Sequence, residues 1–177
     1  MLGQSPAPTT LEIKMNDSKT MKIIRDFYNK LPKFPDGRID YSNSDEAPVI
    51  TVIVKYEDEI LILKRSDKVW TYKGKWQVVA GYLDEVRPLK EKVLEELREE
   101  IGVLESNIKK IKYGKMFEFH DNDIGKTWIA NPVLVELKEK PQIKIDFEHT
   151  EYRWIKPEQI EKFDIVPNLK ESMKRVL

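Results

Sequence analysis

The segment 81–103 constrains the fold more than any other part of this chain, because it contains a helix whose two ends are marked. Pro88 suits the first turn of a helix, where its missing N–H costs no hydrogen bond, and Gly102 suits the position just past the last turn. Between them, apolar residues recur at helical spacing in one stripe: Val93, Leu94, Leu97 and Ile101. We therefore predict a helix over residues 88–101 that packs one face against a core.

The other side of this predicted helix carries a row of carboxylates: Glu95, Glu96, Glu99 and Glu100. Like charges one turn apart repel by roughly a few tenths of a kcal/mol per pair, and Glu near a helix C-terminus also opposes the helix dipole. A hard divalent cation such as Mg²⁺ would offset this repulsion, because it prefers carboxylate oxygens and keeps waters that a substrate phosphate can replace. The alternative interpretation is a solvated Glu-rich surface, which is the usual meaning of a charge run.

The same residues resemble the signature of the Nudix (MutT-like) hydrolases. That signature is Gly, five residues, Glu, seven residues, and then Arg-Glu-aliphatic-x-Glu-Glu-x-Gly-aliphatic. Gly81 opens it here, and its end is matched in register by Glu96, Leu97, Glu99, Glu100, Gly102 and Val103. The resemblance implies that Glu96, Glu99 and Glu100 bind Mg²⁺ or Mn²⁺. Gly81 permits close passage of the backbone, so we expect it to lie at the substrate.

Two positions differ from the family pattern. Arg87 stands where the signature has Glu, and Glu95 stands where it has Arg. Because the signs of both charges are exchanged, we predict that Arg87 and Glu95 attract each other, directly or through the loop, and preserve the family's interaction with reversed charges. The alternative is two unrelated surface residues and a weakened metal site.

A second matching segment lies nearer the C-terminus. Residues 148–154, Glu-His-Thr-Glu-Tyr-Arg-Trp, are similar to the Glu-His-x-x-Tyr-Arg-Trp segment of many Nudix hydrolases. The resemblance implies that Glu148 is a further metal ligand or the general base for the attacking water, with Glu151 as the reserve candidate. Catalytic roles are thus assigned to Glu99 and Glu148. Arg65 ends a predicted hairpin where the family often places a cation that meets substrate phosphate, and an Arg fork suits that group.

The rest of the chain indicates a mixed α/β domain. Strands are expected over the segments 48–55, 59–64, 77–80, 108–119 and 127–137. Within residues 145–155 we expect a loop that leads into a further strand, and residues 169–177 are expected to form a final helix. For residues 48–177 the resemblance implies the Nudix fold, an α/β/α sandwich around a mixed β-sheet.

The N-terminal residues precede the part that resembles the family. Residues 1–14 contain two prolines among small polar residues, so we predict a flexible leader. Residues 15–47 form a predicted helical extension, in which Asp17 or Ser18 caps a helix that runs to about residue 29. The sequence leaves open whether this extension covers the core, joins a homodimer or forms a wall of the substrate pocket.

Composition excludes several classes of protein. The absence of Cys removes thiol catalysis, and with it the common, Cys-dependent form of isopentenyl diphosphate isomerase, which shares the Nudix fold. Basic and acidic residues number 31 each, so no bulk attraction to nucleic acid or to an anionic membrane is expected. No apolar run approaches the roughly 18 residues of a transmembrane helix, and no signal pattern is visible. A cytoplasmic protein is the resulting expectation.

The function implied by the resemblance is metal-dependent hydrolysis of a diphosphate linked to another group. The substrate expected is a small nucleotide, and nucleoside triphosphates, dinucleoside polyphosphates, ADP-ribose-like compounds and capped RNA all stay open. The alternative from another class is a Nudix-fold module that binds nucleotide or RNA without cleaving it. An acidic helix in an unrelated scaffold would require the matches before, within and after the signature to be coincidence.

Overall fold

The computed structural model describes residues 10–177, with side chains from Ser18 onward. Within this range the helices are α1 (Thr10–Lys30), α2 (Leu89–Ile101) and α3 (Leu169–Val176), with short 3-10 turns η1 (Glu105–Asn107) and η2 (Pro157–Lys162). The strands of the same range form one eight-stranded sheet: β1 (Glu46–Tyr56), β2 (Glu59–Arg65), β3 (Trp76–Gln77), β4 (Val79–Tyr82), β5 (Ile108–Tyr113), β6 (Phe117–Asp121), β7 (Lys126–Leu137) and β8 (His149–Ile155).

The sheet is mixed, as predicted. Its strands lie in the order β3-β2-β1-β7-β5, with β4 paired to β1, β6 to β7 and β8 to β2. The long central strands β1 and β7 run parallel, whereas the other pairs of these strands are antiparallel. A parallel pair needs a long crossover connection, and here that connection contains α2.

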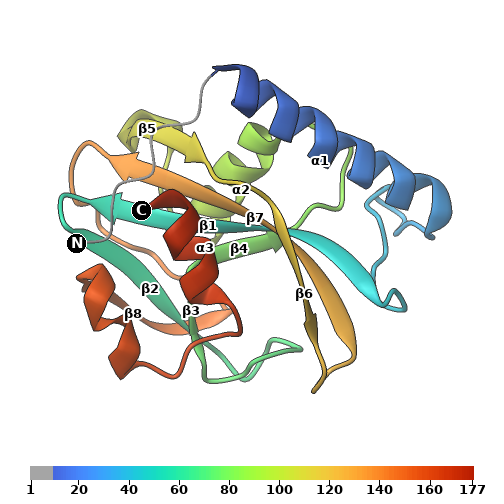
Figure 1. The fold of residues 1–177 in the computed structure, drawn as a ribbon. Coiled ribbons are helices and arrows are strands. Elements are labelled where there is room, and N and C mark those ends of the chain that lie inside the picture. The colour runs from blue at the N-terminus through green and yellow to red at the C-terminus, as the bar shows by residue number, and fades with distance from the viewer. Residues whose placement is uncertain (1–9) are drawn as a thin grey trace.

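Two hydrophobic cores lie on opposite faces of this sheet, because side chains alternate along each strand. On β1, Val52 and Val54 join the core that contains Ile24 of α1 and Leu97 of α2, whereas Ile53 points to the core beneath α3. Figure 1 shows α3 in front of the sheet and α2 behind it. The predicted α/β/α sandwich is therefore confirmed. Among the helices of residues 10–177, none combines the length and apolarity needed to span a bilayer.

Two strands that the sequence predicts as continuous are divided. The segment 77–80 splits into β3, which pairs with β2, and β4, which pairs with β1, so the chain changes partner at Val78. The segment 108–119 splits at residues 114–116, where Gly114 passes so close to α3 that a Cβ would lie 2.7 Å from Cγ1 of Val176. Both breaks depend on contacts with segments distant in sequence, namely the partner strand at Val78 and α3 at Gly114. The periodicity of side chains along a strand carries no information on such contacts.

The N-terminal helix is longer than predicted. It begins at Thr10, so Asp17 and Ser18 lie inside it and neither is its cap. Asp and Ser favour the N-cap position but are also tolerated inside a helix. Because residues 10–16 contain no Pro or Gly, nothing in that segment stops the helix from extending toward the N-terminus. The last part of the predicted leader, residues 10–14, is therefore helical, while residues 1–9 lie outside the described residues.

The predicted extension packs against the sheet. Its residues Ile24, Ile39 and Tyr41 are at most 4% exposed and belong to the same core as β1 and α2. The hydroxyl of Thr20 donates a 2.8 Å hydrogen bond to Oδ1 of Asn131 on β7, which anchors α1 at a buried polar contact. The extension thus covers one side of the core, and its division from residues 48–177 stays a prediction.

Candidate active site

The orientation of α2 sets the position of its carboxylates. Val93, Leu97 and Ile101 are fully buried, which presses the apolar stripe against the sheet. Gly102 ends the helix in the left-handed region at φ 72°, and its N–H bonds to the carbonyl of Arg98 at 3.1 Å. With its rotation and its end both determined, α2 presents its glutamates toward β4 and the neighbouring loops.

The glutamates of α2 lie in different surroundings, so the prediction that they form a row on the side opposite the packed face is only partly right. Glu100 is 2% exposed and Glu96 is 9% exposed, whereas the side chain of Glu99 is 55% exposed and lies 3.8 Å from Arg98. Glu96 and Glu100 are one turn apart at the border of the apolar stripe, so packing of that stripe buries them as well. Of the three predicted metal ligands on α2, two are therefore buried and one, Glu99, reaches solvent.

Gly81 on β4 makes room for Glu96. A Cβ at position 81 would lie 2.4 Å from Oε1 and 2.6 Å from Cδ of Glu96, closer than real Cβ atoms approach other heavy atoms. Gly81 also lines the cleft described below, as its predicted place near the substrate requires. The glycine that opens the signature is thus required by the side chain of a glutamate fifteen positions later.

Glu100 is the least compensated charge of the site. Burial raises the pKa of its carboxyl well above the ordinary range, and the nearby charges of Glu96, Glu148 and Asp146 raise it further. Within residues 10–177, neither Glu100 oxygen has a hydrogen-bond partner. Burial also raises the pKa of Glu148, and Asp146 and Glu96 add to that shift. A cation placed among these carboxylates would offset their mutual repulsion.

The loop that carries Glu148 is held at both sides. The backbone N–H of Ser66 donates to the Glu148 carbonyl at 2.8 Å, and the Ser66 hydroxyl donates to the Phe147 carbonyl at 2.7 Å. The N–H of Asp146 donates to the carbonyl of Glu100 at 3.3 Å, and Oδ1 of Asp146 accepts the Glu148 N–H at 3.1 Å. These contacts tie the loop to the end of β2 and to α2, which brings Glu148 near the helix glutamates.

The reserve candidate, Glu151, lies elsewhere. Its Oε1 accepts hydrogen bonds from Arg153 at 2.6 and 2.9 Å, and it does not line the cleft that Glu148 lines. β8 pairs with β2 through a register shift between Lys64 and Arg65, so His149 lies opposite Arg65 and Glu151 lies opposite Lys64. Neighbouring residues of β2 point to opposite faces of the sheet, which separates Glu151 from the face of Arg65 and His149.

Arg65 is connected to the Glu148 loop through two residues that sequence reasoning missed. Its Nη1 donates to Oε1 of Gln77 at 2.9 Å, Nε2 of Gln77 lies 3.1 Å from Nε2 of His149, and Nδ1 of His149 lies 3.2 Å from Oδ1 of Asp146. Burial lowers the pKa of His149 despite the opposing effect of Asp146, so the ring is neutral at physiological pH. We assign the proton to Nδ1, which donates to Asp146 while Nε2 accepts from Gln77.

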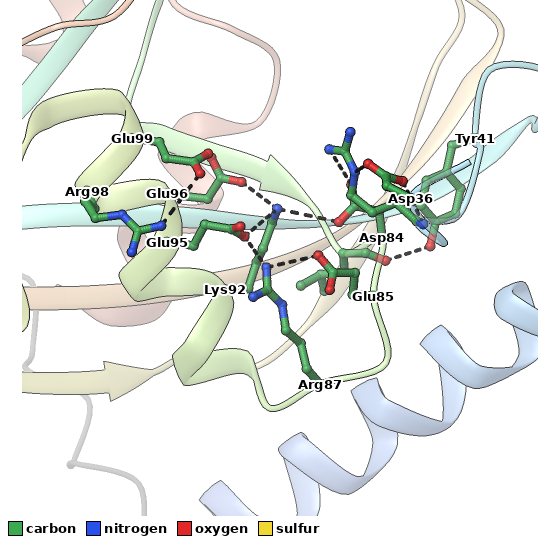
Figure 2. Close-up of polar contacts among 12 residues, drawn as sticks. Asp36, Tyr41, Asp84, Glu85, Arg87, Lys92, Glu95, Glu96, Arg98 and Glu99 are labelled. Carbon is green, nitrogen blue, oxygen red and sulfur yellow. Dashed lines mark hydrogen bonds and ion pairs between the residues drawn. The ribbon is translucent and has the colours of Figure 1, made fainter. Parts of the chain in front are cut away.

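Arg87 and Glu95 form an ion pair in which the guanidinium Nη2 donates to Oε2 of Glu95. The same Nη2 lies 3.4 Å from Oε1 of Glu85, so the arginine joins the loop to α2 (Figure 2). Partial burial raises the pKa of Glu95, but Lys92 and Arg87 outweigh it and the net shift is downward. The predicted contact between the two exchanged positions is present, and its effect on activity stays a prediction.

Lys92 lies among three carboxylates and was not singled out from the sequence. Its Nζ lies 2.7 Å from Oε1 of Glu96, 3.3 Å from Oε2 of Glu95 and 3.5 Å from Oδ1 of Asp84, as Figure 2 shows. Burial lowers the pKa of Lys92, but the charges of Glu96, Asp84 and Glu95 outweigh that effect and raise it overall. The sequence signal was the spacing, since Lys92 precedes Glu95 and Glu96 by three and four residues.

The carboxylates are of the kind that binds a divalent cation, but their oxygens do not converge on a common position. Within the part of the chain that the structure describes, no three acidic or histidine side chains converge as the ligands of a metal ion. Two of the predicted ligands point elsewhere: Glu96 pairs with Lys92, and the Glu99 side chain reaches solvent beside Arg98. The available donors are all carboxylate oxygens. The buried oxygens of Glu100 have no hydrogen-bond partner among the described side chains, and in their ionised form they would suit a hard cation.

These groups border a cleft of about 780 Å³, a size that suits a nucleotide-sized ligand. Its lining includes four glutamates: Glu95, Glu96, Glu99 and Glu148. It also includes aromatic side chains, together named the aromatic side of the cleft: Trp70, Tyr72, Tyr82, Phe119 and Trp128. Asp36 and Arg38 also line the cleft, so the N-terminal extension forms part of its wall.

The aromatic side is held by its own polar contacts. The hydroxyl of Tyr72 donates to Oδ2 of Asp121 at 2.5 Å and accepts from Nε1 of Trp128 at 3.1 Å. Tyr41 of the extension stacks on Tyr82, with ring centroids 5.6 Å apart. Trp70 is 98% exposed, so its whole ring is available to a ligand in the cleft.

Solved structures share this fold. The MutT protein from Methanosarcina mazei Go1 has 24% identity and a TM-score of 0.58, covering 75% of this chain and 92% of that one. The NUDIX domain of Shewanella oneidensis NrtR, complexed with ADP ribose, has 14% identity and a TM-score of 0.62, covering 73% and 85%. A C. elegans Ap4A hydrolase has 15% identity and a TM-score of 0.60, covering 73% and 93%.

The sequence itself identifies the family. A search of curated proteins finds no match to this chain. The family description of the NUDIX domain matches residues 45–176, which is most of the chain and includes the signature helix and the Glu148 loop. Together with the α/β/α sandwich, this match shows that the chain belongs to the Nudix hydrolase family.

Proposed function

We propose that this chain hydrolyses a diphosphate bond in a nucleoside diphosphate linked to another group, such as a nucleoside polyphosphate, a dinucleoside polyphosphate or an ADP-ribose-like compound. The observation that carries the proposal is the Glu100 carboxylate, which is 2% exposed and has no hydrogen-bond partner in residues 10–177. It lies with Glu96 and Glu148 beside a cleft of about 780 Å³. Structures of similar fold include one complexed with ADP ribose and one Ap4A hydrolase.

In this proposal Mg²⁺ or Mn²⁺ is held by carboxylates: Glu96, Glu99, Glu100 and Glu148. Such a cation neutralises phosphate charge and lowers the pKa of bound water. Glu148 has a raised pKa, which suits a base that must take a proton from water near neutral pH. Glu99 is exposed enough to rotate toward such a cation and serve as the second catalytic carboxylate.

Arg65 and the aromatic side of the cleft bind the rest of the substrate in this proposal. Gln77 and Thr71 hold the guanidinium of Arg65 at 2.9 and 2.8 Å, so its orientation toward a phosphate is set before binding. Trp70 lines the cleft and is almost fully exposed, and an exposed ring can stack on any nucleobase. Base stacking together with a phosphate site favours a nucleotide over a simple diphosphate.

The test is a hydrolysis panel of ADP-ribose, diadenosine tetraphosphate, NADH and the nucleoside triphosphates, each with Mg²⁺ and with Mn²⁺. Wild type is compared with Glu99→Gln, which removes a charge at an exposed position and should leave the fold intact. We expect metal-dependent release of phosphate or nucleotide, lowered about 10²- to 10³-fold by the substitution. The matched control is Glu91→Gln, an exposed glutamate in the first turn of α2 that does not line the cleft.

Binding without turnover across the panel would reject the hydrolase and favour the non-catalytic nucleotide-binding alternative. Equal losses in Glu99→Gln and Glu91→Gln would show that the effect comes from the helix charge and not from the proposed site. Turnover that persists in EDTA would reject the metal-dependent form of the proposal.

Gly81→Ala is expected to weaken both metal binding and stability. The new Cβ would lie 2.4 Å from Oε1 of Glu96, so the carboxylate must move from its buried position. We expect a stability loss of about 1–2 kcal/mol, as for modest overpacking, and about tenfold weaker Mn²⁺ binding with a matching fall in kcat/KM. Thermal unfolding and Mn²⁺ titration measure the two effects. Unchanged Mn²⁺ affinity in a folded variant would show that Glu96 does not bind the metal from this position.

A further inference from the structure

Lys92 is enclosed by carboxylates in the way that a bound cation would be. Its side chain is 9% exposed, and its Nζ lies 2.7 Å from Glu96, 3.3 Å from Glu95 and 3.5 Å from Asp84. Glu96 and Glu95 lie within hydrogen-bond distance of the ammonium, whereas Oδ1 of Asp84 is an ion-pair partner that has no hydrogen bond within the described side chains. In Figure 2 the lysine crosses from α2 to the loop that carries Asp84.

The acidic cluster therefore has two parts with different compensation. Glu95, Glu96 and Asp84 share the positive charge of Lys92, and Glu95 also pairs with Arg87. In contrast, both oxygens of Glu100 lack a hydrogen-bond partner in the described residues. Asp84 also pairs with Arg38 at 3.6 Å. The chain itself therefore places cations beside one part of the cluster, whereas Glu100 has no ion-pair partner among the described side chains.

We propose that Lys92 is a resident counter-ion that occupies one cation position of the acidic cluster and competes with divalent cations for Glu96. The inference rests on the proposed function, in which Glu96, Glu99, Glu100 and Glu148 bind Mg²⁺ or Mn²⁺. A divalent ion at Glu96 must either displace the ammonium or lie beside it, and the repulsion between like charges opposes both. The wild-type site thus binds divalent cations less tightly than its carboxylates would without Lys92.

The resident charge also explains how the metal-free chain tolerates so many buried carboxylates. Asp84 and Glu96 are 7% and 9% exposed, and burying an unpaired carboxylate is costly. Lys92 supplies the compensating charge permanently, whatever the metal concentration. Removing this charge should therefore destabilise the metal-free protein and make its stability depend on added cation.

The test compares the full-length wild type with Lys92→Met, which keeps an unbranched apolar side chain and removes the charge. The matched control is Lys90→Met on the same helix, where the side chain is 54% exposed and pairs with Glu105 at the surface. Mn²⁺ binding is measured by titration with detection of free Mn²⁺ by electron paramagnetic resonance. Melting temperatures are measured in EDTA and in Mn²⁺.

We expect Lys92→Met to bind Mn²⁺ about tenfold more tightly than wild type, or to bind one further ion per chain. Its melting temperature should fall in EDTA and rise more steeply with Mn²⁺ than that of wild type, because a ligand of the folded state stabilises by mass action. Lys90→Met should resemble wild type in both measurements, since its charge is screened by solvent.

Unchanged or weaker Mn²⁺ binding by folded Lys92→Met would overturn the proposal, as would an equal gain in Lys90→Met. If Lys92→Met does not fold in EDTA, folding upon addition of Mn²⁺ supports the counter-ion role, and failure to fold with Mn²⁺ rejects it. The result is independent of turnover. Tighter Mn²⁺ binding without hydrolysis of any panel compound would reject only the proposed activity, whereas hydrolysis with unchanged Mn²⁺ binding would reject only the counter-ion.

Discussion

Replacing Glu100 by Gln is expected to lower kcat/KM by about 10²- to 10³-fold and, at the same time, to raise the melting temperature in EDTA. The carboxylate is 2% exposed and has no hydrogen-bond partner within residues 10–177, so in the metal-free protein it costs stability. Leaving such a group unpaired costs about 1–3 kcal/mol. A Gln at this position carries no charge, and its amide can donate to the neighbouring Glu96.

The gain in stability should depend on pH. The folded-state pKa of Glu100 is raised above its ordinary value of 4.5. The contribution of this carboxyl to the free energy of unfolding of the wild type is therefore fully present below that value, and it is lost as pH rises through the folded pKa. Gln does not titrate, so the difference in melting temperature between variant and wild type should be larger at about pH 8 than at about pH 5. For a chain of this size, 1 kcal/mol corresponds to about 2–4 °C.

The measurement is thermal unfolding in EDTA at both pH values, together with kcat/KM on the substrate that the panel identifies. Glu91→Gln serves as control, because it removes the same charge from an exposed site on the same helix. A stabilised but active Glu100→Gln would show that this carboxylate is structural only. A destabilised variant would show that the ionised group already has a partner in the metal-free protein.

Arg87→Glu and Glu95→Arg are each expected to lower stability by about 2 kcal/mol and to reduce activity, because each leaves a charged partner opposed by a like charge. The side chains of this pair are 22% and 25% exposed, so solvent screens the repulsion only in part. Combining the two changes should recover part of the loss. A coupling energy of about 1–3 kcal/mol in the double-mutant cycle would measure the interaction.

The recovery should be incomplete, since each position has a second neighbour. Arginine at position 95 would face Lys92, which lies 3.3 Å from Glu95, and glutamate at position 87 would face Glu85, which lies 3.4 Å from Arg87. Strictly additive losses would show that the two signature positions do not act as a pair.

The control for this cycle is the exposed pair formed by Lys90 and Glu105, with Nζ and Oε1 2.7 Å apart and side chains 54% and 62% exposed. Exchanging these charges should give a coupling energy of about 0–1 kcal/mol, as is usual for surface pairs. A similar coupling energy in both cycles would indicate that partial burial adds nothing to the Arg87 pair.

The sequence by itself predicted the helix and identified the family. Pro88 and Gly102 act locally, one before the first turn of α2 and the other in the left-handed position after its last turn. The apolar spacing reports which side of the helix is buried, and the alternation on β1 reports two faces of a sheet. Matching positions around these elements identified the family, because each signal depends on residues close in sequence.

Only the tertiary structure decided how the charges of the site are compensated. Lys92 meets Asp84 from a separate loop, Glu96 fits only because Gly81 on β4 has no Cβ, and Gln77 joins Arg65 to the Glu148 loop from another strand. Burial then sets the pKa shifts of these groups, and burial depends on how the sheet, the helix and the loops pack together. No local pattern reports such contacts, because their partners are brought together only when the chain has folded.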